Sequence, residues 1–468
     1  MGVFEYYQEK QRPKYMYRTC SEFLKKWLNS SRRKPLVIRG ARQVGKTWIV
    51  RHLAETEKMH LVEFNFEKNP ALASLFDSNN PYEIVKRIEQ RFSLKIDPKK
   101  TLLFLDEIQA KPELFAKLRW FYEDMPELAV VATGSLLEFM LGESPISIPV
   151  GRVSFAYLEP LSFIEFLKAK KKEQLIDFIQ TFSWEHEVNS EIHKELMRLF
   201  KEYVFVGGLP EAVANWVDEG SIDSLRDVHR DLLASYRADF SKYSSKIAPE
   251  ILNEVIDAIP LFLGKKFVYS HVDSTASTVK IKEALNLLCQ ARVGHKIKCS
   301  AANGVPLGAE IHAKAIKALL LDVGLSSAVL DLKLSTLEDI EELDMINKGG
   351  IAEQAVGQLL RTIDACTIEP ALYYWIRHEA GSDAEIDYVI QHSTKVVPIE
   401  VKAGSTGTLK SLHLFMNLKE LTIALRIYSG PPRTDNMSVK DPQAGKDIIY
   451  QLRSIPFYLI SEIHRLLD

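Results

Sequence analysis

The sequence predicts an α/β protein of several domains, from two patterns along the chain and from its composition. Over residues 31–158, short apolar runs alternate with amphipathic stretches, which is typical of a parallel sheet covered by helices. Over residues 159–245 the strand signals stop, and the stretches have the spacing of helices. With 46% hydrophobic and 26% charged residues, the composition is that of an ordinary globular chain. A length of 468 residues allows about three domains.

Each strand predicted in residues 31–158 is a short apolar run bounded by polar or turn residues. The four runs are KPLVIRG (34–40), HLVEFNF (60–66), TLLFLDE (101–107) and LAVVATGS (128–135). Helical spacing of apolar residues marks TWIVRHLAE (47–55), PYEIVKRIEQRF (81–92) and PELFAKLRWFYED (112–124). Because strands and helices alternate in this order, we expect helices on the faces of a parallel sheet.

Five segments follow from these changes of pattern. They are a basic segment (1–30), the α/β core (31–158), a helical subdomain (159–245), a helix-and-hairpin segment (246–330) and a C-terminal α/β segment (331–468). The fourth segment contains two predicted helices, 249–266 and 277–291, followed by two short strands around a turn within 292–311. Two helices followed by a hairpin predict a winged helix. The last segment begins with a helix and continues with strands.

Charge and cysteine usage limit the function classes. The formal net charge of −2 argues against a protein that binds nucleic acid over its whole surface. Residues 1–40 nevertheless hold ten Lys and Arg against three Glu, which suits either a solvated helix face or a patch that faces phosphates. The four cysteines have no paired spacing, which favours a reducing cytoplasm and argues against a zinc module. We find no run of about 18 apolar residues and no secretion signal, so we expect a cytoplasmic protein without a membrane partner.

Residues 40–47 match the pattern G-x-x-x-x-G-K-[ST] between a predicted strand and a predicted helix. In such a loop, backbone N–H groups and the helix dipole bind phosphates. The predicted ATP ligands are Gly40, Ala41, Arg42, Gln43, Val44, Gly45, Lys46 and Thr47. We expect Lys46 to reach the β- and γ-phosphates and to act in catalysis, and Thr47 to ligate Mg²⁺.

Four apolar residues followed by Asp106 and Glu107 form the second nucleotide motif. We expect Asp106 to hold Mg²⁺ and Glu107 to orient the attacking water, as in a hydrolase. The next predicted strand ends near Thr133 and Ser135, either of which could sense the γ-phosphate or simply cap the loop. Asn65 could hold Glu107 in an inactive pose.

In this order, GARQVGKT (40–47), LFLDEIQ (103–109), ATGSLLEFM (132–140) and GRVSFAYLEPLSFIEF (151–166) resemble a family of prokaryotic AAA-type ATPases. Members of this family carry a C-terminal domain of unassigned function. The resemblance extends through YRADFSKY (236–243) and LLLDVGLSSAVL (319–330) to PIEVKAG (398–404). It implies an ATPase core, then a winged helix, then a restriction-endonuclease-like domain.

Arg152 matches the recurrent Gly-Arg of that family. An arginine near the γ-phosphate would neutralise charge in the transition state. The sequence leaves open whether Arg152 acts on its own nucleotide, on that of a neighbouring subunit, or only in a surface ion pair. Arg237, in YRADF, is a further candidate of the same kind.

A predicted hairpin that turns at Ser393-Thr394 carries the second set of candidate residues. In its expected register, Ile390 faces Val397, Tyr388 faces Ile399 and Ile386 faces Val401, all on one face. The other face then holds Asp387 opposite Glu400, with Glu385 and Lys402 beside them. Two facing carboxylates repel each other unless a divalent cation lies between them.

This D…E-x-K arrangement is typical of restriction-endonuclease-like nucleases, which the family resemblance also implies. Lys402 would polarise the scissile phosphate or the attacking water. Glu353, on the first helix of the segment, would be a further metal ligand beside Asp387 and Glu400. The sequence leaves open whether the domain cleaves or only binds nucleic acid.

The sequence therefore predicts a Mg²⁺-dependent ATPase that couples its nucleotide state to a DNA-directed C-terminal domain. The winged helix would contact DNA phosphates through Lys280, Lys282, Arg292, His295, Lys296 and Lys298. The alternative is a signalling or scaffold ATPase whose C-terminal domains bind protein partners and cut nothing. The sequence leaves open whether the chain forms a homo-oligomer.

Overall fold

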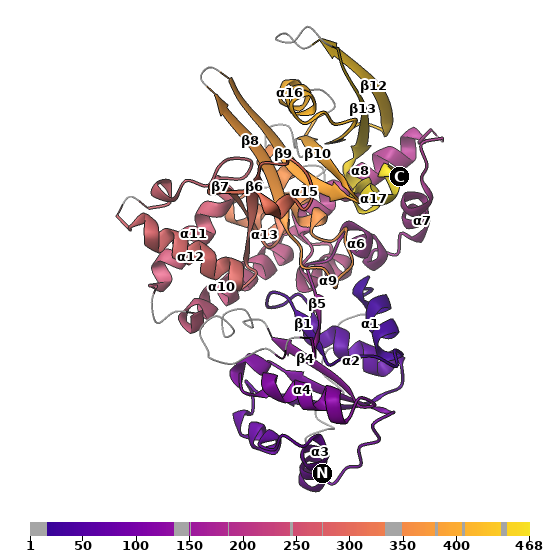
Figure 1. Ribbon diagram of the computed structural model, residues 1–468, viewed down its shortest axis with the longest axis vertical. Coiled ribbons are helices and arrows are strands. Elements are labelled where there is room, and N and C mark those ends of the chain that lie inside the picture. Colours follow the sequence, from indigo (N-terminus) through magenta and orange to yellow (C-terminus); the bar gives the residue numbers. More distant parts are fainter. Residues whose placement is uncertain are drawn as a thin grey trace.

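The computed structural model of the chain contains two β-sheets joined by helices (Figure 1). It describes residues 16–134, 149, 151–185, 187–243, 247–273, 275–332, 349–379, 382–404, 408–440 and 447–468. The five-stranded sheet lies at the lower end of Figure 1 and the eight-stranded sheet at the upper end. In the part of the chain so described, no helix is both long and apolar enough to cross a membrane.

The first sheet confirms the predicted parallel α/β core. Its strands run in the order β2-β3-β4-β1-β5, and every neighbouring pair is parallel. They are β1 (Leu36–Arg39), β2 (His60–Asn65), β3 (Thr101–Asp106), β4 (Ala129–Gly134) and β5 (Ser154–Tyr157). Four of these strands were predicted from the sequence, whereas β5 was not.

Helices cover both faces of this sheet because successive strand residues point to opposite sides. Leu36 and Ile38 pack in one core with α2, whereas Val37 packs in another core with α3 and α4. The elements around the sheet are α1 (Cys20–Leu28), α2 (Lys46–Thr56), η1 (Pro70–Phe76), α3 (Pro81–Phe92), η2 (Ile108–Ala110) and α4 (Leu114–Asp124). The start of α2 lies at the carboxyl ends of the parallel strands, beside the ends of β1 and β3.

Helices fill the middle of the chain. In the described residues between β5 and β6 there is no strand. The elements there are α6 (Phe163–Ala169), α7 (Glu173–Thr181), α8 (Ser190–Val206), α9 (Pro210–Glu219), α10 (Ile222–Tyr243), α11 (Pro249–Leu261), η3 (Tyr269–His271) and α12 (Thr278–Gln290). The Ser277 side chain caps α12 by accepting a hydrogen bond from the N–H of Lys280.

The second sheet has the order β12-β13-β11-β10-β9-β8-β6-β7. Its strands are β6 (Gly294–Ser300), β7 (Ile311–Leu320), β8 (Leu372–Glu379), β9 (Ser382–His392), β10 (Lys395–Lys402), β11 (Ile423–Tyr428), β12 (Arg433–Lys440) and β13 (Asp447–Pro456). Its helical elements are η4 (Leu307–Ala309), α13 (Val323–Val329), α15 (Gly349–Leu360), α16 (Lys410–Lys419), η5 (Phe457–Glu462) and α17 (Ile463–Leu467).

The predicted winged helix does not stand as a separate unit. The helices α11 and α12 are followed by the hairpin β6–β7, as expected, but β6 also pairs in parallel with β8. The hairpin thereby extends the C-terminal sheet, and the predicted boundary near residue 330 divides strands that share hydrogen bonds. Sequence patterns miss this because the pairing joins β6 to a strand more than 70 residues later.

Two helices cover opposite faces of the second sheet. Residues of α15 share a core with Tyr388, Ile399 and Val401, whereas α16 packs with Ile386 and Val389. Ile386 therefore does not share a face with Tyr388, and the predicted single apolar face is wrong at this point. The cause is an irregularity in β9, where Tyr373 pairs with Val389 but Trp375 pairs with Ile386.

Candidate functional site

The phosphate loop lies between β1 and α2 and has the backbone that such a loop requires. Gln43 and Gly45 have φ of 63° and 96°, and Gly45 is the N-cap of α2. Gly40 cannot be replaced by a larger residue without movement, since a Cβ there would lie 2.4 Å from the carbonyl oxygen of Leu158. The loop is therefore held tightly against the segment that follows β5.

Lys46 is buried, whereas a side chain that binds phosphate is expected to be exposed when no nucleotide is bound. Its Nζ donates hydrogen bonds to the carbonyl oxygens of Gly40 (3.1 Å) and Ala41 (2.7 Å). Burial lowers the pKa of Lys46 to about 8, although Glu107 and Asp106 oppose this shift. An anionic phosphate in the loop would favour the charged form of this side chain.

Asp106 is the centre of a hydrogen-bonded group at the carboxyl end of β3. Thr47 Oγ1 lies 3.3 Å from both of its carboxylate oxygens, and Asn65 Nδ2 donates to Oδ2 at 3.0 Å. The buried hydroxyl of Thr133 also donates to Asp106. Asn65 thus binds Asp106 and not Glu107, which corrects the expectation that it holds Glu107 in an inactive pose.

Glu107 follows Asp106 in the left-handed region, with φ of 52°. Its carboxylate accepts a hydrogen bond from Gln109, two residues later, and the side chain is only half-buried. Glu107 is therefore placed beside Asp106 and remains open to solvent. Ser135, the other predicted hydroxyl, lies outside the residues that the structure describes.

The helical subdomain contacts the phosphate loop through α10. The Tyr236 hydroxyl donates to the carbonyl oxygen of Arg42 at 2.8 Å, and Arg42 forms ion pairs with Asp239 and with Glu67 (3.1 Å). Arg42 was expected in the loop from its sequence pattern, whereas the role of Asp239 emerges only from this ion pair. Arg237, a predicted arginine candidate, instead pairs with Asp257 on α11.

Arg152 lies at the amino ends of the strands, whereas the phosphate loop lies at their carboxyl ends. It precedes β5, which is parallel to β1, so it is close to the amino ends of the strands. It forms an exposed ion pair with Glu123 of α4 at 2.7 Å. The placement contradicts action on the nucleotide of its own chain, while action on a neighbouring subunit stays a prediction.

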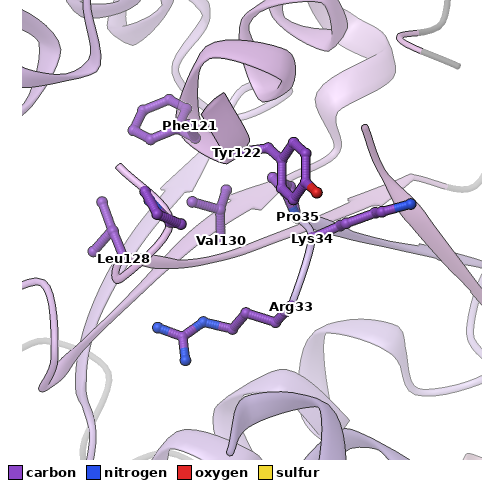
Figure 2. A pocket seen from close by; sticks show the side chains of 8 residues that line it. Arg33, Lys34, Pro35, Phe121, Tyr122, Leu128 and Val130 are labelled. Carbon is purple, nitrogen blue, oxygen red and sulfur yellow. The ribbon is translucent and has the colours of Figure 1, made fainter. Parts of the chain in front are cut away.

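Two basic residues are among those that line a small depression beside Tyr122, over whose ring Arg152 lies (Figure 2). Figure 2 shows Arg33, Lys34 and Tyr122 among its lining residues. Arg33 donates hydrogen bonds to the carbonyl oxygens of Leu28 (2.9 Å) and Glu127. This arginine of the basic N-terminal region therefore secures backbone and is not free to bind phosphates.

Arg18 is a second basic residue of the N-terminal region that hydrogen-bonds to the backbone of the protein. It is buried, and it donates to the carbonyl oxygens of Val44 (2.8 Å) and Glu159 (2.6 Å). Its Nε lies 3.3 Å from Glu165. Arg18 therefore joins the phosphate loop to the segment after β5, a contact that no local sequence pattern indicates.

Glu159 is a buried carboxylate that the sequence analysis missed. Arg361, which follows α15, donates to both of its oxygens at 3.0 and 2.9 Å, and Arg292, before β6, approaches at 3.3 Å. Burial alone would raise the pKa of Glu159, but Arg361 and its neighbours outweigh burial and hold it at about 2. Burial also lowers the pKa of the nearby His295 well below its usual range, so the two arginines carry the balancing charge.

We expect Glu159→Ala to destabilise the protein strongly, because it leaves Arg292 and Arg361 buried without their shared carboxylate. Breaking a buried ion pair typically costs about 3–5 kcal/mol. Urea unfolding should show a large drop in the midpoint, and the exposed Glu123→Ala serves as the control with a much smaller drop. A folded-state pKa near 2 also means that this stabilisation is present at neutral pH and declines as pH falls from about 4.5 towards 2. A midpoint equal to that of the control would contradict the role of Glu159.

The C-terminal hairpin has the predicted register. Val397 pairs with Ile390 and Ile399 with Tyr388, and the turn lies at Ser393-Thr394. The paired ladder ends before Asp387 and Glu400, because Asp387 Oδ2 instead accepts the N–H of Val401 at 2.7 Å. Asp387 and Glu400, the two predicted metal ligands, therefore lie on neighbouring strands but are not paired in the backbone ladder.

Lys317 of β7 lies among the carboxylates, which the sequence analysis did not foresee. Its buried Nζ is 3.1 Å from Glu353 and also pairs with Glu385. Burial disfavours the charge of Lys317, but Glu353, Asp387 and Glu385 outweigh burial and raise its pKa. Within the described residues, no group of three or more His, Cys, Asp or Glu side chains is suited to hold a metal ion. The expected convergence of Glu353, Asp387 and Glu400 on one cation is therefore not seen, and the ammonium group of Lys317 neutralises Glu353.

Glu400 and Lys402 complete a cluster of charged side chains, here called the carboxylate cluster. Its members are Glu353, Glu385, Asp387, Glu400, Lys317 and Lys402. Lys402 Nζ lies 2.6 Å from Glu400 Oε1, while the buried Glu400 Oε2 has no hydrogen-bond partner. Burial, with the charge of Asp387, raises the pKa of Glu400 to about 7, and that of Glu353 to about 8. An unsatisfied buried carboxylate oxygen is costly. With its pKa raised to about 7, Glu400 can carry a proton near neutral pH.

Two basic residues of the predicted wing are not free for DNA. Arg292 and His295 are buried against Glu159, as described above. Lys296 donates to Asn286 of α12. Lys280, Lys282 and Lys298 are exposed. Only part of the predicted phosphate-binding set is therefore placed on a surface.

Three parts of the chain match known protein families. Residues 32–167 match the AAA domain, residues 197–336 match a domain of unknown function, DUF8612, and residues 348–439 match a second, DUF4143. No relative among the curated proteins matches the chain.

Solved structures from several organisms match the chain at low sequence identity. The Aeropyrum pernix ORC2 protein, in ADPNP and ADP complexes, is 13% identical over 72% of this chain and 97% of its own, with a TM-score of 0.33. The Thermotoga maritima RuvB Holliday junction branch migration motor is 17% identical over 60% and 89%, with a TM-score of 0.28. C. elegans PCH-2 is 12% identical over 42% of this chain and 61% of its own, with a TM-score of 0.26. The match to the AAA domain spans the phosphate loop and Asp106-Glu107, so residues 32–167 are similar to an AAA domain.

Proposed function

We propose that the chain hydrolyses ATP and couples its nucleotide state to a DNA-directed C-terminal domain. The observation that carries this proposal is the course of α15. Glu353, near the start of this helix, belongs to the carboxylate cluster. Arg361, directly after its end, binds Glu159. One helix thus connects the carboxylate cluster to Glu159.

The path from Glu159 to the phosphate loop is short. Arg18 donates to both the Glu159 and the Val44 carbonyl oxygens, and the Leu158 carbonyl touches the position of Gly40. If the loop changed its conformation when the γ-phosphate binds or leaves, the contacts of Glu159 would change. Through Arg361, the position of α15 would then change as well. Coupling of distant sites requires a contact that has two arrangements, and we propose that this chain of contacts is that element.

The side chains around Asp106 suit a Mg²⁺–ATP substrate. Thr47 and Asp106 would hold the Mg²⁺ ion, since hydroxyl and carboxylate oxygens are the ligands that this ion prefers. Bound there, the ion would neutralise phosphate charge. Lys46 would exchange its two carbonyl partners for phosphate oxygens, and Glu107 would orient the attacking water.

Exposed lysines beside the carboxylate cluster support the proposal that the C-terminal domain binds DNA. Gly264 packs directly on Glu353, since a Cβ at Gly264 would lie 2.7 Å from Glu353 Oε1. Lys265 and Lys266 follow at once, and both are exposed. Lysines placed in this way can bind the phosphates of a duplex that approaches the cluster.

We expect duplex DNA to change the ATPase rate severalfold at low salt, with the effect fading as salt rises. Steady-state ATP hydrolysis with and without duplex tests this, together with the electrophoretic mobility of the complex. The double variant Lys265→Ala, Lys266→Ala should lose most of the response, whereas the control Lys25→Ala, Lys26→Ala on α1 should keep it. A duplex that alters neither rate nor mobility would contradict the DNA-directed function.

We further propose that Asp387 and Glu400 bind a divalent cation, with Lys402 beside it. The free Oε2 of Glu400 supports this, as does the charge of the cluster. Its six side chains comprise four carboxylates (Glu353, Glu385, Asp387, Glu400) and two ammonium groups (Lys317, Lys402). The raised pKa values of Glu353 and Glu400 mean that these carboxylates hold protons near neutral pH, and a divalent ion would take the place of such protons.

The expected result is that Glu400→Gln weakens Mn²⁺ binding by about tenfold or more, because it removes a charged ligand. Electron paramagnetic resonance can count the bound Mn²⁺ in an Asp106→Asn background, which removes the ligand at the ATP site. Glu283→Gln, an exposed glutamate on α12, is the matched control. In the otherwise wild-type chain, Asp387→Asn should leave ATP hydrolysis nearly unchanged and should eliminate any DNA cleavage. Equal Mn²⁺ binding by Glu400→Gln and the control would rule out this cation site.

The burial of Arg292 and His295 favours the second candidate function, a nucleotide-dependent scaffold that binds protein partners. In that case the C-terminal domain would respond to ATP through the same helix, α15. The DNA assay above separates the two functions, because a protein scaffold would show no response of the ATPase to duplex.

A further inference from the structure

Cys20 and Cys366 lie in contact although 346 residues separate them along the chain. Their Sγ atoms are 3.0 Å apart. Cys20 is the first residue of α1 and is buried, while Cys366 lies in the segment between α15 and β8 and is half-buried. The other two cysteines, Cys289 and Cys299, lie in α12 and β6. None of the four cysteines forms a disulfide, so this contact is between reduced groups.

The two thiols of this pair are unequal. The hydrogen bond from Cys20 lowers the pKa of Cys366, whereas the same contact and burial raise the pKa of Cys20. Cys366 is therefore the more readily ionised thiol and also the more accessible one. Because the thiolate is the reactive form, Cys366 is the thiol that an oxidant meets first, with Cys20 in place to resolve the product.

We propose that Cys20 and Cys366 form a redox-modification site, at which a hydroperoxide converts the two thiols into a reversible disulfide. The Cys366 thiolate attacks a peroxide oxygen, the O–O bond breaks, and a sulfenic acid forms as one water or alcohol leaves. Cys20 then attacks the sulfenic sulfur, the S–S bond forms and a water leaves. With hydrogen peroxide, two thiols and one peroxide give one disulfide and two waters. The sulfur atoms need to approach each other by only about 1 Å to reach bonding distance.

The bond would cross the contact between the ATPase domain and the C-terminal sheet. Arg18, two residues before Cys20, binds the Val44 carbonyl of the phosphate loop. On the other side, the Cys366 carbonyl accepts the N–H of Tyr157, the last residue of β5, at 2.7 Å. Oxidation would therefore tie α1 to the segment that joins α15 to β8. The constraint acts on the pathway proposed above for coupling, but the chemistry of the site does not depend on that function.

Peptide mapping of the oxidised full-length chain tests the proposal. The reduced protein is treated with hydrogen peroxide, quenched with catalase, alkylated and digested without reductant. We expect a cross-linked peptide pair containing Cys20 and Cys366, lighter by two hydrogen atoms than the two free peptides together, and lost on treatment with dithiothreitol. The matched control carries Cys289→Ser and Cys299→Ser and should give the same cross-link. Cys20→Ser should instead leave Cys366 as a sulfenic, sulfinic or sulfonic acid.

Two results would overturn the proposal. One is that both thiols of the wild-type chain remain open to alkylation after peroxide treatment. The other is a different main product, either a disulfide between other cysteines or an over-oxidised Cys366 beside a free Cys20. Because the wild-type chain itself is mapped, the answer does not depend on whether a variant folds.

Discussion

Lys46→Ala should lower the affinity for ATP by about 100-fold or more and abolish hydrolysis. In the phosphate loop this lysine is the charged donor for the phosphates, and charge-assisted hydrogen bonds contribute about 1.5–3 kcal/mol each. The substitution also removes the hydrogen bonds from Nζ to the Gly40 and Ala41 carbonyls. We therefore expect a modest loss of stability in addition, of about 1–3 kcal/mol.

Titration with a fluorescent ATP analogue measures the affinity, and thermal unfolding without nucleotide measures the stability. Lys26→Ala, an exposed lysine on α1, is the matched control and should change neither quantity. If folded Lys46→Ala protein bound nucleotide as tightly as the wild type, the phosphate-loop assignment would be wrong. The stability measurement matters because Lys46 is buried, so a weak signal from unfolded protein must be excluded.

Glu107→Gln should bind ATP normally and hydrolyse it about 10²–10⁴ times more slowly. A general base contributes a factor of this size, and an amide cannot accept the proton or orient the water as a carboxylate does. The substitution keeps the length of the side chain and the strained backbone at φ of 52°, so the loop should not rearrange.

Single-turnover hydrolysis with the nucleotide already bound separates this chemical effect from binding. The control Glu113→Gln lies six residues further along and is exposed, and it should retain the wild-type rate. Wild-type turnover by Glu107→Gln would remove Glu107 from the catalytic role. The neighbouring residue would then need testing, since Asp106 holds Thr47, Asn65 and Thr133 together.

Local patterns predicted the elements that carry the ATPase chemistry. The apolar run of β3 and the two carboxylates after it are contiguous, and the phosphate loop is contiguous with β1 and α2. The hairpin register from Lys395 to Ile399 followed from the turn at Ser393, because a two-residue turn leaves one choice of pairing. The same reasoning failed at Ile386, where the irregularity in β9 changes the face of the strand.

The sequence by itself determined the parallel core, the phosphate loop, Asp106-Glu107 and the D…E-x-K hairpin, since each is a pattern within a few consecutive residues. Only the tertiary structure decided the partners of these groups. It placed Lys317 among the C-terminal carboxylates, Arg152 away from its own phosphate loop and Glu159 between Arg292 and Arg361. It also brought Cys20 to Cys366 across 346 residues. The physical reason is that a buried charge or thiol is stabilised by whatever lies next to it in space, and contacts between distant segments leave no periodicity or spacing in the chain.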